Sequence, residues 1–250
     1  MKKIINNIEV LALVYKSVDY LKMIHRELVS EKIKVDGWDV SFRIVANDAT
    51  HEVLEYLKEN DINHSIYKDP KPQDFYLNRV YRCWNYAGNT SNFSNICFVN
   101  SDMVFSKNWL TNLLKYHDGT KIPCSRLVES GKMPSGTHGI SMNFGRHPNQ
   151  IKNSKWEDWA EKISVNKIEK RGLFMPCVFE TKTFKDSGGY PEGNIFIVGG
   201  KLEAGHPNNM PFYMSGDKYY FERLKDKYQL EHITVFDSLV YHIQEGEKDE

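Results

Sequence analysis

The sequence predicts an α/β fold, in which helices flank a mostly parallel central sheet, and three observations support this. Short apolar runs alternate with amphipathic segments of helical period over residues 8–99. With 250 residues and 40% hydrophobic content, the chain can bury a large core. Gly and Pro become frequent from about Gly119 onward, which indicates an irregular second half.

The first half contains predicted strands and helices in strict alternation. Apolar runs predict strands over residues 8–15, 40–46, 62–67 and 96–99. Helical spacing predicts helices over residues 18–30, 51–58 and 73–87, and Thr50 is positioned to cap the second helix. Strands that alternate with helices imply right-handed crossovers, so we expect parallel pairing with the carboxyl ends of the strands at one edge.

The second half contains fewer regular patterns. We expect helices over residues 154–169 and 219–227, and a final strand over residues 231–241. Trp156 and Trp159 share one helical face, and we interpret them as core residues rather than as a platform for a sugar ring. The segments 131–147 and 193–210 are rich in Gly, His, Asn and Pro, and we expect them to form loops that close over a site.

Composition and charge disfavour several functional classes. The 33 basic and 33 acidic residues balance, so a nucleic-acid partner is not expected. The apolar stretch at residues 10–15 is far shorter than the roughly 20 residues of a transmembrane helix, and no signal pattern precedes it. We therefore expect no transmembrane segment and a cytoplasmic protein. The four cysteines lack C-x-x-C spacing, so we expect them to be reduced and mostly buried.

Two polar side chains follow the first two predicted strands. Tyr15 comes directly after the first strand, and Asp48 comes after the second, where both face the same crevice. A tyrosine ring can stack on a nucleobase, and a carboxylate can accept the imide N–H of uracil because it only accepts hydrogen bonds. In the alternative interpretation, Asp48 and Thr50 simply cap the following helix.

A third group of polar residues follows the fourth strand. Asn100, Ser101 and Asp102 lie where a buried strand meets a loop, and the Asp102 carboxylate can hold a divalent cation there. Asn78 and Arg79 lie on the preceding helix, and Arg79 offers a fixed fork of donors for phosphate oxygens. In the alternative interpretation, Arg79 is an ordinary surface residue.

Two further candidates lie near the end of the chain. Asp217 follows Ser215 and Gly216 at the start of a predicted helix, and His242 ends the last predicted strand. Asp217 can act as a general base, or it can simply be the N-cap of its helix. His242 can bind the same cation as Asp102, or it can be a satisfied histidine on an edge strand.

The order of these residues resembles the GT-A glycosyltransferases, and most of all the inverting family 2 enzymes. Phe184 with Gly188, Gly189 and Tyr190 is similar to that family's F…GGF/Y segment. Gly216 and Asp217, followed by Tyr220 and Arg223, resemble its ED motif and the helix after it. The resemblance covers about residues 8–242.

The resemblance implies a metal-dependent inverting glycosyltransferase that moves a sugar from a nucleoside diphosphate donor, with UDP expected, to a saccharide or other hydroxyl acceptor. It implies that Asp102 and His242 hold Mn²⁺ or Mg²⁺ and that Asp217 is the general base. The residues that it assigns to the donor are Tyr15, Asp48, Asn78, Arg79, Asn100 and Ser101. One domain over residues 1–250 is implied, with a donor half over about 1–105, an acceptor half over about 106–245, and a frayed tail over 246–250.

The sequence departs from the family pattern at two positions. Asn100 stands where the family usually has the first Asp of its D-x-D element, and Gly216 stands where it often has Glu. An inactive nucleotide-binding or carbohydrate-binding module with the same fold is therefore one alternative. A sugar-nucleotide pyrophosphorylase is another, although the Gly-rich phosphate loop expected after its first strand is replaced here by Val-Tyr-Lys-Ser-Val at residues 14–18.

Overall fold

The computed structural model describes residues 6–131, 136–205 and 211–243. All seven strands and helices predicted for the first half are present, with bounds that differ by a few residues. They are β1 (Asn6–Val14), α1 (Val18–Leu28), β2 (Trp38–Asn47), α2 (His51–Glu59), β3 (His64–Tyr67), α3 (Tyr76–Thr90) and β4 (Asn95–Asn100), with a short 3₁₀ helix, η1, at Glu31–Ile33. Thr50 caps α2 as expected, because its side chain accepts a hydrogen bond from the amide of Val53.

The second half contains more regular structure than its sequence predicts. Its elements are β5 (Met103–Phe105), α4 (Trp109–Leu114), β6 (Lys121–Glu129), β7 (Ile140–Ser141), η2 (Pro148–Gln150), α5 (Asn153–Ile163), β8 (Ile168–Lys170), β9 (Cys177–Glu180), α6 (Thr181–Asp186), β10 (Asn194–Val198), β11 (Lys201–Gly205), α7 (Gly216–Tyr228) and β12 (Glu231–His242).

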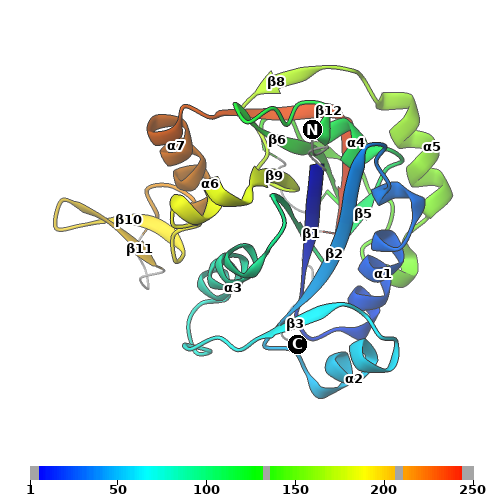
Figure 1. The fold of residues 1–250 in the computed structure, drawn as a ribbon, viewed down its shortest axis with the longest axis horizontal. Helices are drawn as coiled ribbons and strands as arrows, with labels where there is room; N and C mark the ends of the chain where they lie inside the picture. Colours follow the sequence, from blue (N-terminus) through cyan, green and yellow to red (C-terminus); the bar gives the residue numbers. More distant parts are fainter. Residues whose placement is uncertain (1–5, 132–135, 206–210, 244–250) are drawn as a thin grey trace, which may run out of the picture.

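Two predictions for this half are wrong in part. The helix expected over 154–169 ends at Ile163, because residues 168–170 pair with β12 instead. The loop expected over 193–210 contains an antiparallel hairpin, β10–β11, which projects from the body of the protein (Figure 1). Residues 132–135 and 206–210 of the two predicted loops lie outside the described residues.

Among the described residues, ten strands form the central sheet, in which parallel pairs predominate along the first half. The path runs β3-β2-β1-β4-β9-β6-β12-β5, with β7 beside β6 and β8 beside β12. Strand β9 is antiparallel to β4 and β6, and β5 and β8 are antiparallel to β12, so the sheet is mixed. Helices α1, α2 and α5 cover one side, and α3, α6 and α7 cover the other (Figure 1). The predicted α/β class is therefore confirmed.

The sheet must curl, because β4 and β5 are neighbours in the chain but not in the sheet. Only Ser101 and Asp102 separate them, and such a link spans roughly 10 Å. The four steps along the path from β4 to β5 would span about 19 Å in a flat sheet at roughly 4.8 Å per strand. The curl therefore brings the end of β4 close to the end of β12.

The packing of the described residues agrees with two further predictions. Trp156 is fully buried and Trp159 packs against the same apolar cluster, so both are core residues. All four cysteines are free and buried. No helix within residues 6–131, 136–205 and 211–243 has the length and apolar character needed to cross a bilayer.

We predict that His232 makes the fold sensitive to acid. Its ring lies between Phe174 and Phe221, and burial lowers its pKa to about 4. Since the pKa of His232 is lower in the folded state than the unfolded value of about 6.5, protonation favours the unfolded state. The free energy of unfolding is therefore highest above pH 6.5 and falls as the pH drops toward 4. Urea unfolding at pH 7 and pH 4.5 is expected to show a loss on the order of 2 kcal/mol from this residue.

The His232→Gln variant is expected to flatten the dependence of unfolding free energy on pH, whereas His51→Gln, which changes an exposed histidine on α2, is expected to leave it unchanged. An identical pH slope in wild type and His232→Gln would contradict the prediction.

Candidate functional site

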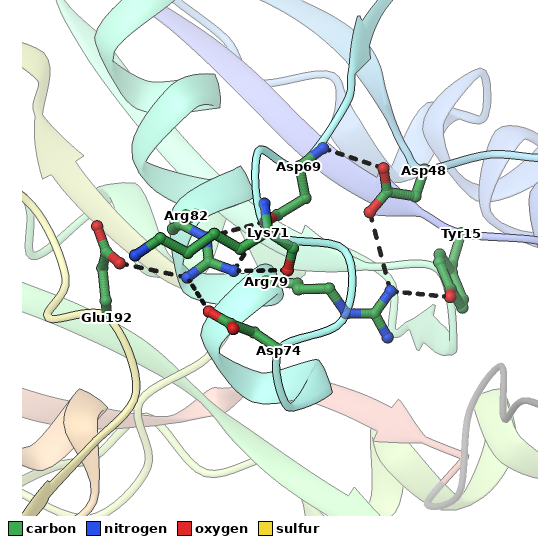
Figure 2. Close-up of polar contacts among 8 residues, drawn as sticks. All are labelled: Tyr15, Asp48, Asp69, Lys71, Asp74, Arg79, Arg82 and Glu192. Atoms are coloured by element: carbon green, nitrogen blue, oxygen red, sulfur yellow. Dashed lines mark hydrogen bonds and ion pairs between the residues drawn. The ribbon is translucent and has the colours of Figure 1, made fainter. Parts of the chain in front are cut away.

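The candidate site begins at the carboxyl ends of β1 and β2, where Tyr15 and Asp48 lie side by side (Figure 2). Arg79 of α3 joins them: its Nη1 donates a hydrogen bond to the Tyr15 hydroxyl at 3.1 Å and lies 3.8 Å from Asp48 Oδ2. The structure therefore brings together three residues that the sequence assigned to the nucleotide.

Asp48 does not cap α2, because Thr50 has that role. Its backbone is left-handed, with φ of 46°, and its Oδ1 accepts a hydrogen bond from the Asp69 amide at 3.0 Å. Its Oδ2 is buried and has no hydrogen-bond partner within the part of the chain that the structure describes. A buried carboxylate oxygen without a partner costs free energy, and a ligand N–H can offset that cost.

The second arginine of α3 has a structural role. Arg82 is 7% exposed and forms ion pairs with Asp69 at 2.8 Å, Asp74 at 3.0 Å and Glu192 at 3.2 Å, and it also contacts the Lys71 carbonyl (Figure 2). Burial opposes ionisation of Asp69, but the bonds from Arg82 outweigh it and lower the Asp69 pKa. This network ties the loop after β3 and the loop before β10 to α3. Arg82 is therefore not free to bind a phosphate.

Asp102 and His242 meet at the point where β4, β5 and β12 come together. Asp102 Oδ2 lies 3.1 Å from His242 Nε2, and the Asp102 carbonyl accepts a hydrogen bond from the Ile243 amide at 2.9 Å. His242 Nδ1 lies 2.8 Å from Glu129 Oε2 on β6. His242 is not on an edge strand, since β12 lies between β5 and β6. Two residues that are 140 positions apart in the sequence are thus in direct contact.

The charges around His242 suit a cation. Burial opposes protonation of the imidazole, but the carboxylates of Asp102 and Glu129 outweigh it and raise the His242 pKa to about 10. Asp102 Oδ1 is buried and has no hydrogen-bond partner among the described residues. No three His, Cys, Asp or Glu side chains in the described part of the chain converge on one metal position. Asp102 and His242 could therefore supply at most two protein ligands to a metal, and its remaining ligands would have to come from a bound substrate or water.

The remaining donor-side candidates lie nearby but make fewer contacts. Ser101 is 7% exposed, and its amide donates to the Leu13 carbonyl of β1 at 3.0 Å, so the 100–102 turn lies against the end of β1. Asn100 pairs with Leu13 in the strand register. Asn78 lies against Gly193, and its Oδ1 is buried and has no hydrogen-bond partner in the described region.

Asp217 lies in the first turn of α7 and is held to α3. Its amide donates to the Tyr81 hydroxyl at 3.0 Å, and the preceding amide, of Gly216, donates to Asn194 Oδ1 at 3.2 Å. Burial raises the pKa of Asp217, while bonds from Ser215 and the Lys218 amide act in the opposite direction. Ser215, not Asp217, is at the N-cap position. Within the described residues, the hydrogen bonds of Asp217 join it to Tyr81, Ser215 and Lys218 rather than to Asp102.

The Phe184–Tyr190 segment connects α3 with α7. Asn85 clamps it, because its Nδ2 donates to the Tyr190 carbonyl at 2.8 Å and its Oδ1 accepts from the Tyr190 amide at 2.7 Å. Arg223 of α7 donates to the Gly189 carbonyl. Gly88 has no side chain, which leaves room for the Phe184 ring on α3. These contacts join α3, α6 and α7 into one layer beneath Asp217.

Sequence reasoning missed three residues that shape the site. Glu129 lies at the end of a strand that was not predicted, Glu192 lies in a loop, and Tyr81 lies on a helical face that looks like ordinary core. The sequence contained one signal for Glu129. An apolar pair, Leu127 and Val128, is followed directly by this carboxylate, much as an apolar run precedes Asp102.

Comparison with solved structures identifies the architecture. The chain matches the structure of S. aureus TarS residues 1–349 with a TM-score of 0.54 at 13% identity, over 94% of this chain and 60% of that chain. It matches GalNAc-T7, solved with UDP, GalNAc and Mn²⁺, with a TM-score of 0.57 at 10% identity, over 96% of this chain and 44% of that chain. The chain has the GT-A fold.

The GT-A fold here spans less than two thirds of either matched chain. Neither the scan against protein-family models nor the search of curated proteins finds a match.

We predict that Asn85→Ala destabilises the layer that carries Asp217. The variant loses both hydrogen bonds to the Tyr190 backbone and leaves those groups unpaired, which costs roughly 2–3 kcal/mol. Urea unfolding measures the loss. Asn92→Ala, at an exposed position after the same helix, is the matched control and is expected to unfold like the wild type. Equal stability of the two variants would show that the clamp contributes nothing.

Proposed function

We propose that the protein is a metal-dependent inverting glycosyltransferase that moves a sugar from a UDP-sugar to a hydroxyl of a saccharide or another acceptor. The observation that carries the proposal is the position of Tyr15, Asp48 and Asp102 at the carboxyl ends of β1, β2 and β4 in a GT-A sheet. Ligands of open α/β sheets bind at this edge. Residues from about 1–105 would form the donor half and those from about 106–245 the acceptor half of one domain.

The donor nucleotide would lie across the ends of β1 and β2. Tyr15 would stack on the base. Asp48 Oδ2, which accepts no hydrogen bond within the described residues, would accept the imide N–H of uracil. Arg79, which contacts both Tyr15 and Asp48, would bind phosphate oxygens with its guanidinium group. Asn100 and Ser101 would contact the ribose or water around the metal, and Asn78 would border the donor from α3. The presence of UDP and Mn²⁺ in the GalNAc-T7 structure supports this choice of nucleotide and metal.

Asp102 and His242 would hold Mn²⁺ or Mg²⁺. The ion would offset the negative charge that the departing diphosphate gains. The protein's own contribution would be two ligands: the Asp102 carboxylate, whose buried Oδ1 accepts no hydrogen bond within the described residues, and the His242 imidazole, which contacts two carboxylates.

Asp217 would be the general base. A sugar hydroxyl is a poor nucleophile until a positioned carboxylate accepts its proton, and burial raises the Asp217 pKa in the direction that strengthens it as a base. The acceptor oxygen would attack the anomeric carbon from the face opposite the diphosphate, its proton would pass to Asp217, and the bond to the diphosphate would break. This course inverts the anomeric configuration.

A hollow beside α7 is a suitable place for the acceptor. Its volume is about 640 Å³, and it runs along the helix from Lys218, next to Asp217, to Gln229. Phe174 and Phe221 provide aromatic surface, and Arg171 and Lys225 provide hydrogen-bond donors. Aromatic faces pack well on the C–H faces of sugar rings, so this lining suits a hydroxylated acceptor.

We predict that Asp217→Asn abolishes turnover without loss of donor binding. The amide cannot accept the acceptor proton, so release of UDP from a panel of UDP-sugars with Mn²⁺ and simple saccharides is expected to fall by about 10²–10⁴-fold. Thermal shift with UDP and Mn²⁺ is expected to stay as in the wild type.

Asp226→Asn, at an exposed position on the same helix, is the matched control and is expected to keep full activity. Wild-type rates in Asp217→Asn would remove Asp217 from the mechanism, and a panel in which no UDP-sugar raises the melting temperature would remove UDP as the nucleotide.

We also predict that Asp48→Asn changes the choice of base. The carboxylate accepts from uracil but repels the bare ring nitrogen of cytosine, whereas an amide can donate to that nitrogen. UDP affinity, measured by calorimetry, is expected to fall about 10-fold or more, and the preference for UDP over CDP is expected to shrink. Asp39→Asn, at an exposed position of the same strand, provides the control. An unchanged ratio of UDP to CDP affinity would argue against contact between Asp48 and the base.

A binding module without turnover is the second candidate, and Asn100 favours it because a neutral amide stands where the family usually has a carboxylate. Such a protein would bind UDP with Mn²⁺ but would release no UDP from any UDP-sugar, and Asp217→Asn would change nothing measurable.

A further inference from the structure

We infer that Glu129 is a positioning residue for the metal site: its carboxylate holds Nδ1 of His242 so that Nε2 is presented to the position shared with Asp102. The inference rests on the proposed function, since it concerns the cation that Asp102 and His242 would hold. Glu129 itself would not be a ligand.

The sheet register produces this arrangement. His242 on β12 pairs with Met103 of β5 on one side and with Glu129 of β6 on the other. The ring therefore lies between Asp102, which precedes Met103, and Glu129. The distances are 3.1 Å from Nε2 to Asp102 Oδ2 and 2.8 Å from Nδ1 to Glu129 Oε2.

The two ring nitrogens point in different directions, so the two carboxylates cannot both hold one ion together with the histidine. This agrees with the finding that no three such side chains converge on a metal position within the described residues. One carboxylate must act through the histidine, and the unpartnered Oδ1 of Asp102 marks Asp102 as the ligand. Glu129 is then the carboxylate that does not bind the ion and instead holds the histidine through Nδ1.

The chemistry of imidazole explains what Glu129 contributes. An Nδ1–H that donates to a carboxylate fixes the tautomer and the ring orientation, and it makes Nε2 a better ligand. The Glu129 side chain is 8% exposed, and a carboxylate that is so buried requires a partner. His242 supplies that partner from a strand 113 residues later in the chain.

The inference is tested by measuring the Mn²⁺ affinity of the 250-residue chain in the presence of UDP, from the electron paramagnetic resonance signal of free Mn²⁺. Glu129→Ala is expected to weaken Mn²⁺ binding about 10–100-fold. Glu129→Gln is expected to lose less, because its amide oxygen still accepts from Nδ1–H. Since Glu129 acts through the histidine, the double variant with His242→Ala is expected to bind no more weakly than His242→Ala alone.

Glu9→Ala is the matched control. Glu9 is also a buried carboxylate in a strand of the sheet, and it pairs with Arg43 at 2.9 Å, away from the candidate site. This variant is expected to melt at a lower temperature but to bind Mn²⁺ like the wild type. Equal losses of Mn²⁺ affinity in Glu9→Ala and Glu129→Ala would overturn the inference, because the effect would then reflect general destabilisation.

Electron spin-echo envelope modulation of bound Mn²⁺ provides a second readout, because it detects a directly coordinated imidazole nitrogen. The nitrogen signal is expected in the wild type, weakened in Glu129→Ala and absent in His242→Ala. If the wild type binds Mn²⁺ without a nitrogen signal, the inference fails while a metal site at Asp102 stands. If the wild type does not bind Mn²⁺ at all, the inference and the metal dependence of the proposed function both fail.

Discussion

The pairing of β5 with β12 is the constraint on which the candidate site depends. Residues 101 and 102 are the only link between β4 and β5, so the parallel strands of the first half and the pair β6–β12 of the second half must curl toward each other at Asp102. This turn therefore lies at the same edge of the sheet as Tyr15 and Asp48, and it leads directly into β5, the strand that pairs with His242. A slip of one residue in this register would move His242 to the opposite face of the sheet and separate it from both carboxylates.

Helix α3 connects the two sides of the site. From its first turns, Arg79 reaches toward β1 and β2, while Tyr81 and Arg82 reach toward α7 and the loop before β10. Removing a guanidinium and its carboxylate partners from water costs desolvation free energy, which the ion pairs offset only in part. The Arg82 network is therefore weak evidence for added stability. The network instead fixes the orientation of α3. Because Arg82 pairs with charged residues on two loops, α3 is held in one position relative to the strand ends, and Arg79, on the same helix, is held with it.

The parts of the structure that depend on local patterns were predictable, and those that depend on long-range pairing were not. Strand-helix alternation up to residue 99 and the Thr50 cap follow from short-range chemistry, and the structure has them. The sequence predicts a helix that runs to residue 169, because only pairing with β12, more than 60 residues later, makes residues 168–170 a strand. Asp102 and His242 were singled out by their positions at strand ends. Glu129 was not, since its role exists only once β6, β12 and β5 are aligned.

The charge balance around His242 gives a physical reason why Asn100 need not prevent cation binding. A divalent ion in a buried site requires compensating negative charge, and a D-x-D element supplies two carboxylates from one turn. Here that turn supplies one, Asp102, and the second negative charge in the cluster comes from Glu129 across His242. A neutral imidazole between two carboxylates leaves the cluster with two negative charges, which match a divalent cation. Without the cation, a protonated His242 neutralises part of that charge, in keeping with its raised pKa.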